Sequence, residues 1–194
     1  MPGTERYWDE LRQSDPQEVC RRALVSCSHK GCYSLYFLHK EYCIDPAHET
    51  ALLTAESDRV GASEPGMLFV MYLLRAQDMP LSGTWITEKG LPGGALFFQG
   101  PHTLPAGHLI RTFGEDPCGL IERGKALGGR PVKFGDAAVE LQPLPRVPMV
   151  CVIWCADDEF PARASFLFDS TAGAQLPLDV ILDLTHRTVT YLTG

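Results

Sequence analysis

Three consecutive strands are predicted in residues 137–169, which read AAVELQPLPRVPMVCVIWCADDEFPARASFLFD. The apolar cores of these strands are residues 137–141, 149–155 and 162–168. The intervening segments, 143–148 and 157–161, are too short for the crossover of a dozen or more residues that a parallel pair needs. The stretch therefore predicts an antiparallel three-strand meander near the C-terminus.

The rest of the chain adds a hairpin and about five helices. Residues 33–45 alternate and are rich in Tyr, Leu and Phe, which predicts a hairpin with His39 and Lys40 as its connection. Capping residues or prolines open each predicted helix, and Ser63, Glu64 and Pro65 are expected to open the second. The predicted helices cover residues 16–24, 67–76, 105–113, 117–127 and a segment from near 177.

Strands and helices are segregated along the chain more than they alternate, so the expected fold class is α+β rather than a doubly wound sheet. Hydrophobic residues at 45% and charged residues at 21% provide enough apolar area for a packed core. Without a repeat or a low-complexity linker in 194 residues, the simplest expectation is one domain over residues 1–194.

Charge and cysteine content narrow the possible partners and location. The net charge of −7, without a cluster of Lys and Arg, argues against a nucleic-acid partner. The longest apolar run, 67–74, is far shorter than the ~18 residues of a membrane helix, so no membrane partner is expected. Seven cysteines, an odd number, without an export signal indicate reduced thiols and a cytoplasmic location.

A glycine-rich segment over residues 91–102 is the first candidate site. Adjacent Gly93 and Gly94 allow a backbone to approach a ligand closely, and His102 after a Gly-Pro step could be a ligand or a proton carrier. The alternative is a tight turn before a short buried strand, with His102 bonded to a loop carbonyl.

The second candidate site is the acidic turn Asp157, Asp158 and Glu159, with Asp169 closing the following strand. Adjacent carboxylates repel one another, which suits a divalent metal or a general acid. The alternative is an ordinary exposed turn, since Asp is a common turn former.

Cysteine spacing raises the question of zinc. Cys27 and Cys32 are spaced like a zinc ligand pair, and whether they bind a metal is left open. His39 and Cys43 are expected at the far end of the next strand, about 20 Å from Gly31 at ~3.3 Å per residue, which opposes a shared site. Cys151 and Cys155 are expected to be packing residues.

A series of short motifs is similar to an uncharacterised family known as domain of unknown function 3786. The motifs are, in order, Pro-Leu-Ser-Gly-x-Trp (80–85), Leu-Pro-Gly-Gly (91–94), Gly-Pro-His (100–102), Leu-Gly-Gly (127–129), Pro-Arg-Val-Pro (145–148), Trp154, Asp-Asp-Glu-Phe-Pro-Ala (157–162) and Leu-Phe-Asp (167–169). The resemblance covers about residues 33–184. It implies an anaerobic setting and a role beside metalloenzymes or corrinoid-dependent methyl transfer, and it supplies no established activity.

These observations lead to one main hypothesis, a ligand- or cofactor-handling accessory protein. Its pocket is expected where the glycine segment ending at His102 meets the acidic turn and Trp154. The expected ligand-binding residues are Trp85, Gly93, Gly94, His102, Trp154 and Asp169. A planar or metal-bearing ligand such as a tetrapyrrole, a corrinoid or a divalent metal would suit them, with an iron-sulfur or corrinoid protein as partner.

Two alternatives remain open. The first is a small hydrolase or lyase in which Asp158 or Glu159 acts as general base and His102 as acid, around a divalent metal held by Asp157, Asp158 and Glu159. The second is a protein-protein interaction module whose motifs hold turns and strand ends.

Overall fold

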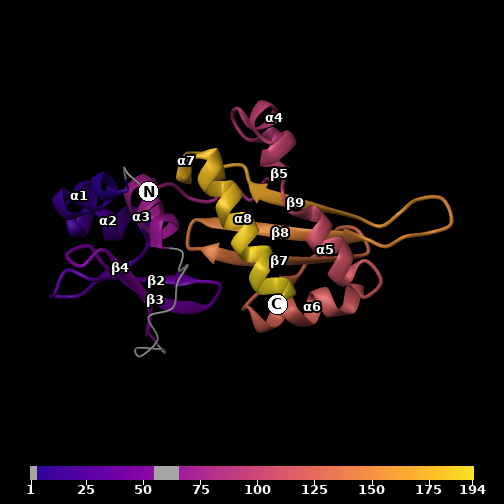
Figure 1. Ribbon diagram of the computed structural model, residues 1–194, viewed down its shortest axis with the longest axis horizontal. Coiled ribbons are helices and arrows are strands. Elements are labelled where there is room, and N and C mark those ends of the chain that lie inside the picture. The colour runs from indigo at the N-terminus through magenta and orange to yellow at the C-terminus, as the bar shows by residue number, and fades with distance from the viewer. Residues whose placement is uncertain (1–3, 55–65) are drawn as a thin grey trace.

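A computed structural model describes residues 4–54 and 66–194 of the chain and has two antiparallel sheets flanked by helices (Figure 1). The predicted α+β class is confirmed, although the strands divide between two sheets rather than one. Among these residues, no helix combines the length and apolarity needed to cross a bilayer.

The four-stranded sheet is formed by the first half of the chain, in the order β1-β2-β3-β4. Its strands are β1 (Ser26–Cys27), β2 (Tyr33–Phe37), β3 (Lys40–Asp45) and β4 (Thr50–Leu53). The predicted hairpin is β2-β3, but its connection is Leu38 and His39 rather than His39 and Lys40. Both connecting residues have positive φ, 46° and 69°, which a two-residue hairpin of matching twist requires.

The five-stranded sheet has the order β5-β9-β8-β7-β6 and contains the predicted meander. Its strands are β5 (Trp85–Thr87), β6 (Arg130–Pro131), β7 (Ala137–Leu144), β8 (Val147–Trp154) and β9 (Arg163–Asp169). The β7-β8 connection is only Pro145 and Arg146, shorter than the expected residues 143–148, because β7 includes Pro143 and β8 includes Pro148. A register shift after Leu141 accommodates this extension.

The five predicted helices are all present, and the described residues also include α1 and four short helical elements that the sequence did not reveal. The longer helices are α1 (Glu5–Gln13), α2 (Pro16–Ala23), α3 (Gly66–Arg75), α5 (Ala106–Phe113), α6 (Pro117–Ala126) and α8 (Leu178–Thr193). The shorter helical elements are η2 (Glu88–Gly90), α4 (Gly94–Phe97), η3 (Gly100–His102) and α7 (Ala172–Gln175).

Local caps account for two of these helix starts. Asp15 accepts a hydrogen bond from the Gln17 amide at 3.0 Å, and Asp116 accepts one from the Gly119 amide at 2.9 Å. The expected opening of α3 by Ser63, Glu64 and Pro65 lies outside the described residues.

Helices cover one face of the larger sheet, while α1, α2 and α3 pack with the smaller one (Figure 1). A single cluster of buried apolar side chains includes Phe37 of the smaller sheet, Phe69 of α3, and Phe166 and Phe168 of the larger sheet. On the opposite face of the larger sheet, Trp85 and Trp154 pack over Ala138, Val150 and Val152.

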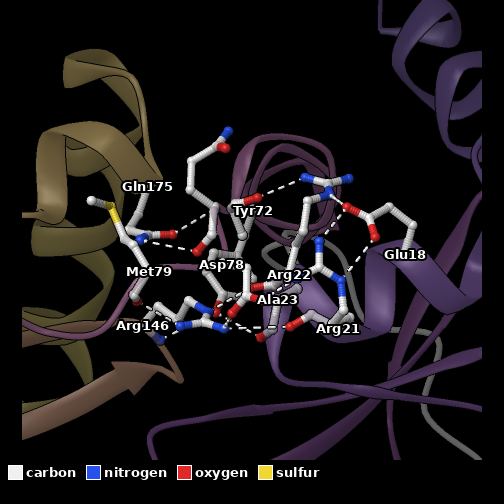
Figure 2. Close-up of polar contacts among 11 residues, drawn as sticks. Glu18, Arg21, Arg22, Ala23, Tyr72, Asp78, Met79, Arg146 and Gln175 are labelled. Carbon is white, nitrogen blue, oxygen red and sulfur yellow. Dashed lines mark hydrogen bonds and ion pairs between the residues drawn. The ribbon is translucent and has the colours of Figure 1, made fainter.

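The tight β7-β8 turn inserts Arg146 between the two halves of the molecule (Figure 2). Arg146 is 7% exposed, and its guanidinium group donates four hydrogen bonds. Its Nε donates to the Arg22 carbonyl at 2.5 Å, and its Nη1 donates to the Met79 carbonyl at 2.6 Å. Its Nη2 lies 2.6 Å from the Asp78 carboxylate, which also pairs with exposed Arg21. Arg146 thus joins the end of α2 and the segment after α3 to the larger sheet.

A buried tyrosine extends this network. The Tyr72 hydroxyl on α3 accepts from the Arg146 amide at 3.1 Å and donates to the Ala23 carbonyl at 2.8 Å. Burial raises the Tyr72 pKa above its usual value, which keeps the phenol neutral and able to donate. Nearby, Gln175 exchanges two hydrogen bonds with the Gln77 backbone, at 2.8 and 3.3 Å (Figure 2).

Replacing Arg146 by Ala is expected to lower the free energy of unfolding by about 3 to 5 kcal/mol, because several buried acceptors lose their donor. Arg146→Lys should recover little of this loss, since one ammonium cannot reproduce the planar fork. Urea denaturation at pH 7 measures both variants. As the matched control, Arg21→Ala should cost less than about 1 kcal/mol, because its ion pairs are exposed. Equal effects of the two alanine variants would contradict this role of Arg146.

Candidate functional site

The glycine-rich segment forms two helical turns, α4 and η3, instead of the expected turn followed by a strand. Gly93 has φ of +78°, a left-handed conformation that glycine adopts without strain. At Gly94 an added Cβ would lie 1.9 Å from the Glu88 carbonyl oxygen, so no larger residue fits this backbone. The two glycines therefore set the shape of the segment.

Anchors on both sides hold this segment to the body of the protein. Leu91 and Phe98 are buried in the core, at 2% and 5% exposure. Between these anchors the chain turns outward, and Leu96 is 85% exposed, the highest value for a large hydrophobic residue in the described part of the chain. Figure 1 shows α4 standing clear of the sheets beyond β5. The result is a projection with an apolar tip, for which we use the name α4 projection (residues 91–102).

His102 is exposed and lies flat on an aromatic ring. The Phe97 and His102 rings are stacked, with centroids 4.5 Å apart and planes inclined by 4°. Phe97 also meets Phe98 edge to face at 5.0 Å. This stacking fixes the imidazole against the α4 projection.

The acidic turn is organised by one of its own carboxylates. Asp157 accepts hydrogen bonds from the amides of Glu159 and Phe160 at 2.9 and 2.7 Å, and these bonds hold its pKa below the usual value. Asp158 and Glu159 are exposed. Trp154, at the end of β8, lies under Arg163 with the guanidinium carbon 5.0 Å from the ring centroid.

Asp169, another of the expected ligand residues, is buried, and its carboxylate accepts hydrogen bonds from Ser82, Gly83 and Thr171. It accepts from the amide and hydroxyl of Ser82 at 3.1 and 2.9 Å and from the Gly83 amide at 2.8 Å. The amide and hydroxyl of Thr171 add bonds of 3.0 and 2.6 Å. Burial alone would raise the pKa of this carboxyl, but the bonds from Thr171 and Ser82 outweigh it and lower the pKa to about 2.

Strand register separates the expected site residues into different regions. Trp154 pairs with Arg163 at one end of β9, whereas Trp85 pairs with Asp169 at the other end. At ~3.3 Å per residue these ends are about 20 Å apart. Asp169 is therefore remote from the acidic turn.

His102 is also separated from the acidic turn. The C-terminal end of α5, at Gly114, lies against Ala162 beside that turn. The residues of η3 precede the opposite end of α5, which is about 12 Å away at 1.5 Å per residue. Figure 1 likewise shows α4 and the long β8-β9 connection as separate projections. The structure thus does not bring His102 together with Asp157, Asp158 and Glu159 in one cavity.

Metal ligands do not converge in the described part of the chain. Across residues 4–54 and 66–194, no three His, Cys, Asp or Glu side chains are grouped closely enough to hold a metal ion together. Asp157, Asp158 and Glu159 are thus adjacent in sequence without forming a joint ligand set.

Cysteines gather on the smaller sheet in a way that the sequence did not predict. Cys43 was expected far from Cys32, but β3 returns antiparallel to β2 and places Cys43 opposite Ser34. Cys27, Cys32 and Cys43 consequently line one cavity of about 430 Å³. Burial raises the pKa of the Cys27 thiol, and burial together with Cys43 raises that of Cys32 to about 11. Cys151 is wholly buried, in agreement with its expected packing role.

Three prominent features escaped the sequence argument: the Arg146 network, the exposed tip at Leu96 and the cysteine-lined cavity. The motif Pro-Arg-Val-Pro contained the only signal for the first, a charged residue enclosed by apolar ones. The other two depend on tertiary placement, which residue spacing alone does not supply.

Asp169→Asn should show that this carboxylate stabilises the fold through its charge. Because its folded pKa is lowered from 3.8 to about 2, its contribution is present above about pH 4 and is lost as the pH falls toward 2. We expect the wild type to lose about 2 kcal/mol more stability than the variant between pH 6 and pH 2. Urea denaturation across this range measures the difference, and Asp158→Asn, at an exposed position, should follow the wild type. Parallel pH profiles for the wild type and Asp169→Asn would refute the assignment.

Comparison with known proteins identifies the family. A family model described as a domain of unknown function (DUF3786) matches residues 15–191. No curated protein and no solved structure matches the chain. Because the matched region includes every element from α2 to β9 and most of α8, the chain belongs to the DUF3786 family.

Proposed function

We propose that this chain is an accessory protein that binds a partner protein through the α4 projection. The observation that carries the proposal is Leu96, 85% exposed on a backbone whose shape is set by Gly93 and Gly94. An exposed apolar side chain on a preorganised backbone loses little conformational entropy when it is buried by a partner. Binding hot spots have this character, an anchor that fills a desolvated pocket.

The shape of the projection favours a protein partner over a small ligand. Small-molecule sites are concave and enclose most of their ligand. The α4 projection stands out from the fold (Figure 1), and within it only Leu91, Gly94 and Phe98 are buried. A leucine on such a projection fits an apolar pocket on another protein, where the stacked Phe97 and His102 rings would form the edge of the contact.

An iron-sulfur or corrinoid protein is the partner class that we propose, from the family resemblance and an anaerobic, cytoplasmic setting. The alternative of acid-base catalysis is not favoured, because it needs His102 within hydrogen-bond reach of Asp158 or Glu159, directly or through one water. His102 lies near the start of α5 and the acidic turn lies near its end, and a helix of this length spans about 12 Å, which argues against such a hydrogen bond. A cofactor bound by Trp85, Trp154 and Asp169 together is likewise not favoured, since Asp169 already has five donors and lies about 20 Å from Trp154.

Photo-crosslinking tests the proposal directly. A photoreactive amino acid at position 96 should capture a specific protein in cells, and a probe at exposed position 24 should not. The captured protein, once purified, should contain an iron-sulfur cluster or a corrinoid. Leu96→Asp should then raise the Kd for this partner by about 30-fold, the equivalent of a 2 kcal/mol hot spot.

Two variants sharpen this test. Gly94→Ala should weaken binding as Leu96→Asp does, because it distorts the projection while keeping the leucine. Leu24→Asn is the control, since it removes another exposed leucine at a left-handed position that asparagine tolerates. The proposal fails if Leu96→Asp binds the partner as tightly as Leu24→Asn does.

A further inference from the structure

The Asp169 carboxylate joins two chain segments that support the base of the α4 projection. Its Oδ1 accepts four hydrogen bonds, two from Ser82 and two from Thr171, and its Oδ2 accepts the bond from the Gly83 amide. Ser82 and Gly83 directly precede the approach to β5, whereas Thr171 directly precedes α7. One buried side chain therefore fastens the start of β5 to the start of α7.

The first of these segments leads into the projection. After β5 the chain forms η2, and the Leu91 amide donates to the Glu88 carbonyl at 3.3 Å to close that turn. Gly94, the first residue of α4, packs on the same carbonyl so closely that an added Cβ would lie 1.9 Å from its oxygen. The position of β5 and η2 therefore determines where α4 begins.

The second segment lies under the projection. A Cβ added at Gly173 of α7 would lie 3.1 Å from Cδ of Pro92 and 3.7 Å from the Leu91 side chain. The Leu178 side chain, at the start of α8, lies 3.6 Å from the Cβ position of Gly93. The base of the projection is thus seated on α7 and on the first residue of α8.

We infer that Asp169 is a positioning residue that holds Leu96 in the orientation in which it meets its partner, an inference that rests on the proposed function. Asp169 acts through the two supports, because its five hydrogen bonds join them. β5 is an edge strand with three paired residues, so its own ladder supplies little support. Without the carboxylate the projection leaves its seat, and a smaller fraction of the protein is competent to bind.

Asp169→Asn is the sharpest variant, because it preserves the size of the side chain. An asparagine with its oxygen at the Oδ1 position keeps the bonds from Ser82 and Thr171 and turns its NH2 group toward the Gly83 amide. Two donors then face each other, and the chain before β5 is displaced. The flipped side chain would lose four bonds instead of one.

A contact at the base supplies a readout that needs no partner. One α-proton of Gly93 points along the Cβ direction toward the Leu178 methyl group, so a nuclear Overhauser effect between them reports a seated projection. In full-length Asp169→Asn at pH 7 we expect this effect to lose most of its intensity. A general loss of stability would leave it unchanged, because folded molecules still dominate the sample.

Asp157→Asn is the matched control, since it removes a carboxylate that also accepts backbone hydrogen bonds but lies in the acidic turn. It should keep the wild-type Overhauser effect. Melting temperatures verify that both variants are folded at pH 7. If Asp169→Asn is not, Thr171→Val takes its place, because it removes one bond to the same carboxylate.

Affinity for the partner captured from position 96 is the second measurement. If the seated fraction falls to about one tenth, the apparent Kd of Asp169→Asn rises about 10-fold, since it varies inversely with that fraction. An unchanged Overhauser effect, or an unchanged Kd for a captured partner, overturns the positioning role alone. Failure to capture any partner from position 96 overturns the proposed function and this inference with it.

Discussion

The guanidinium group of Arg146 is the point on which the two halves of this structure depend. It is buried at the turn between β7 and β8, pairs with the Asp78 carboxylate and donates hydrogen bonds to the backbone carbonyls of Arg21, Arg22 and Met79. Two of these carbonyls belong to the last turn of α2, where the helix dipole already favours a cation. A charge this enclosed tolerates only one relative arrangement of its neighbours, because each displaced acceptor would leave a donor unpaired. Arg146 thereby fixes where the N-terminal helices meet the larger sheet.

Four aspartates, among them Asp157 and Asp169 of the expected sites, hold backbone structure. Asp15, Asp116, Asp157 and Asp169 all accept hydrogen bonds from backbone amides close to their own position in space. Their carboxylates hold helix starts, a turn and a strand end. Stacking engages His102 in the same way with Phe97. These candidate site residues therefore hold turns and the ends of helices and strands.

The elements that were predicted correctly are those whose sequence signals, such as a cap or a long apolar run, lie within the element itself. The helices α2 and α6 were predicted because a capping aspartate and a proline stand at their first turn, and the meander because its strands are long and apolar. Strands β1 and β6 have two residues each, too few to show any period. The segment at Gly93 and Gly94 was expected to be a turn, since a four-residue helix held by distant anchors leaves no periodic pattern.

The candidate sites were harder to predict for a related reason. Asp169 meets Ser82 and Gly83 across 86 to 87 positions of chain, and the Arg146 guanidinium meets the Arg21 carbonyl across 125. Cys43 lines the same cavity as Cys32 only because the intervening hairpin has a definite register. Pairings of this kind follow from the complete fold, so motifs could identify the residues and not their partners.

The hairpin turn at Leu38 and His39 has an implication for how the smaller sheet assembles. Leu38 has φ of +46°, a conformation in which Asn or Gly would be less strained than leucine. Its side chain is nevertheless buried, at 1% exposure, in the core that both sheets share. Its amide also donates to the Pro143 carbonyl of β7 at 3.4 Å. The turn is thus imposed by docking rather than encoded by its own residues. A synthetic peptide of residues 33–45 would have no reason to adopt this register, and the hairpin should be acquired only once the larger sheet is present as its template.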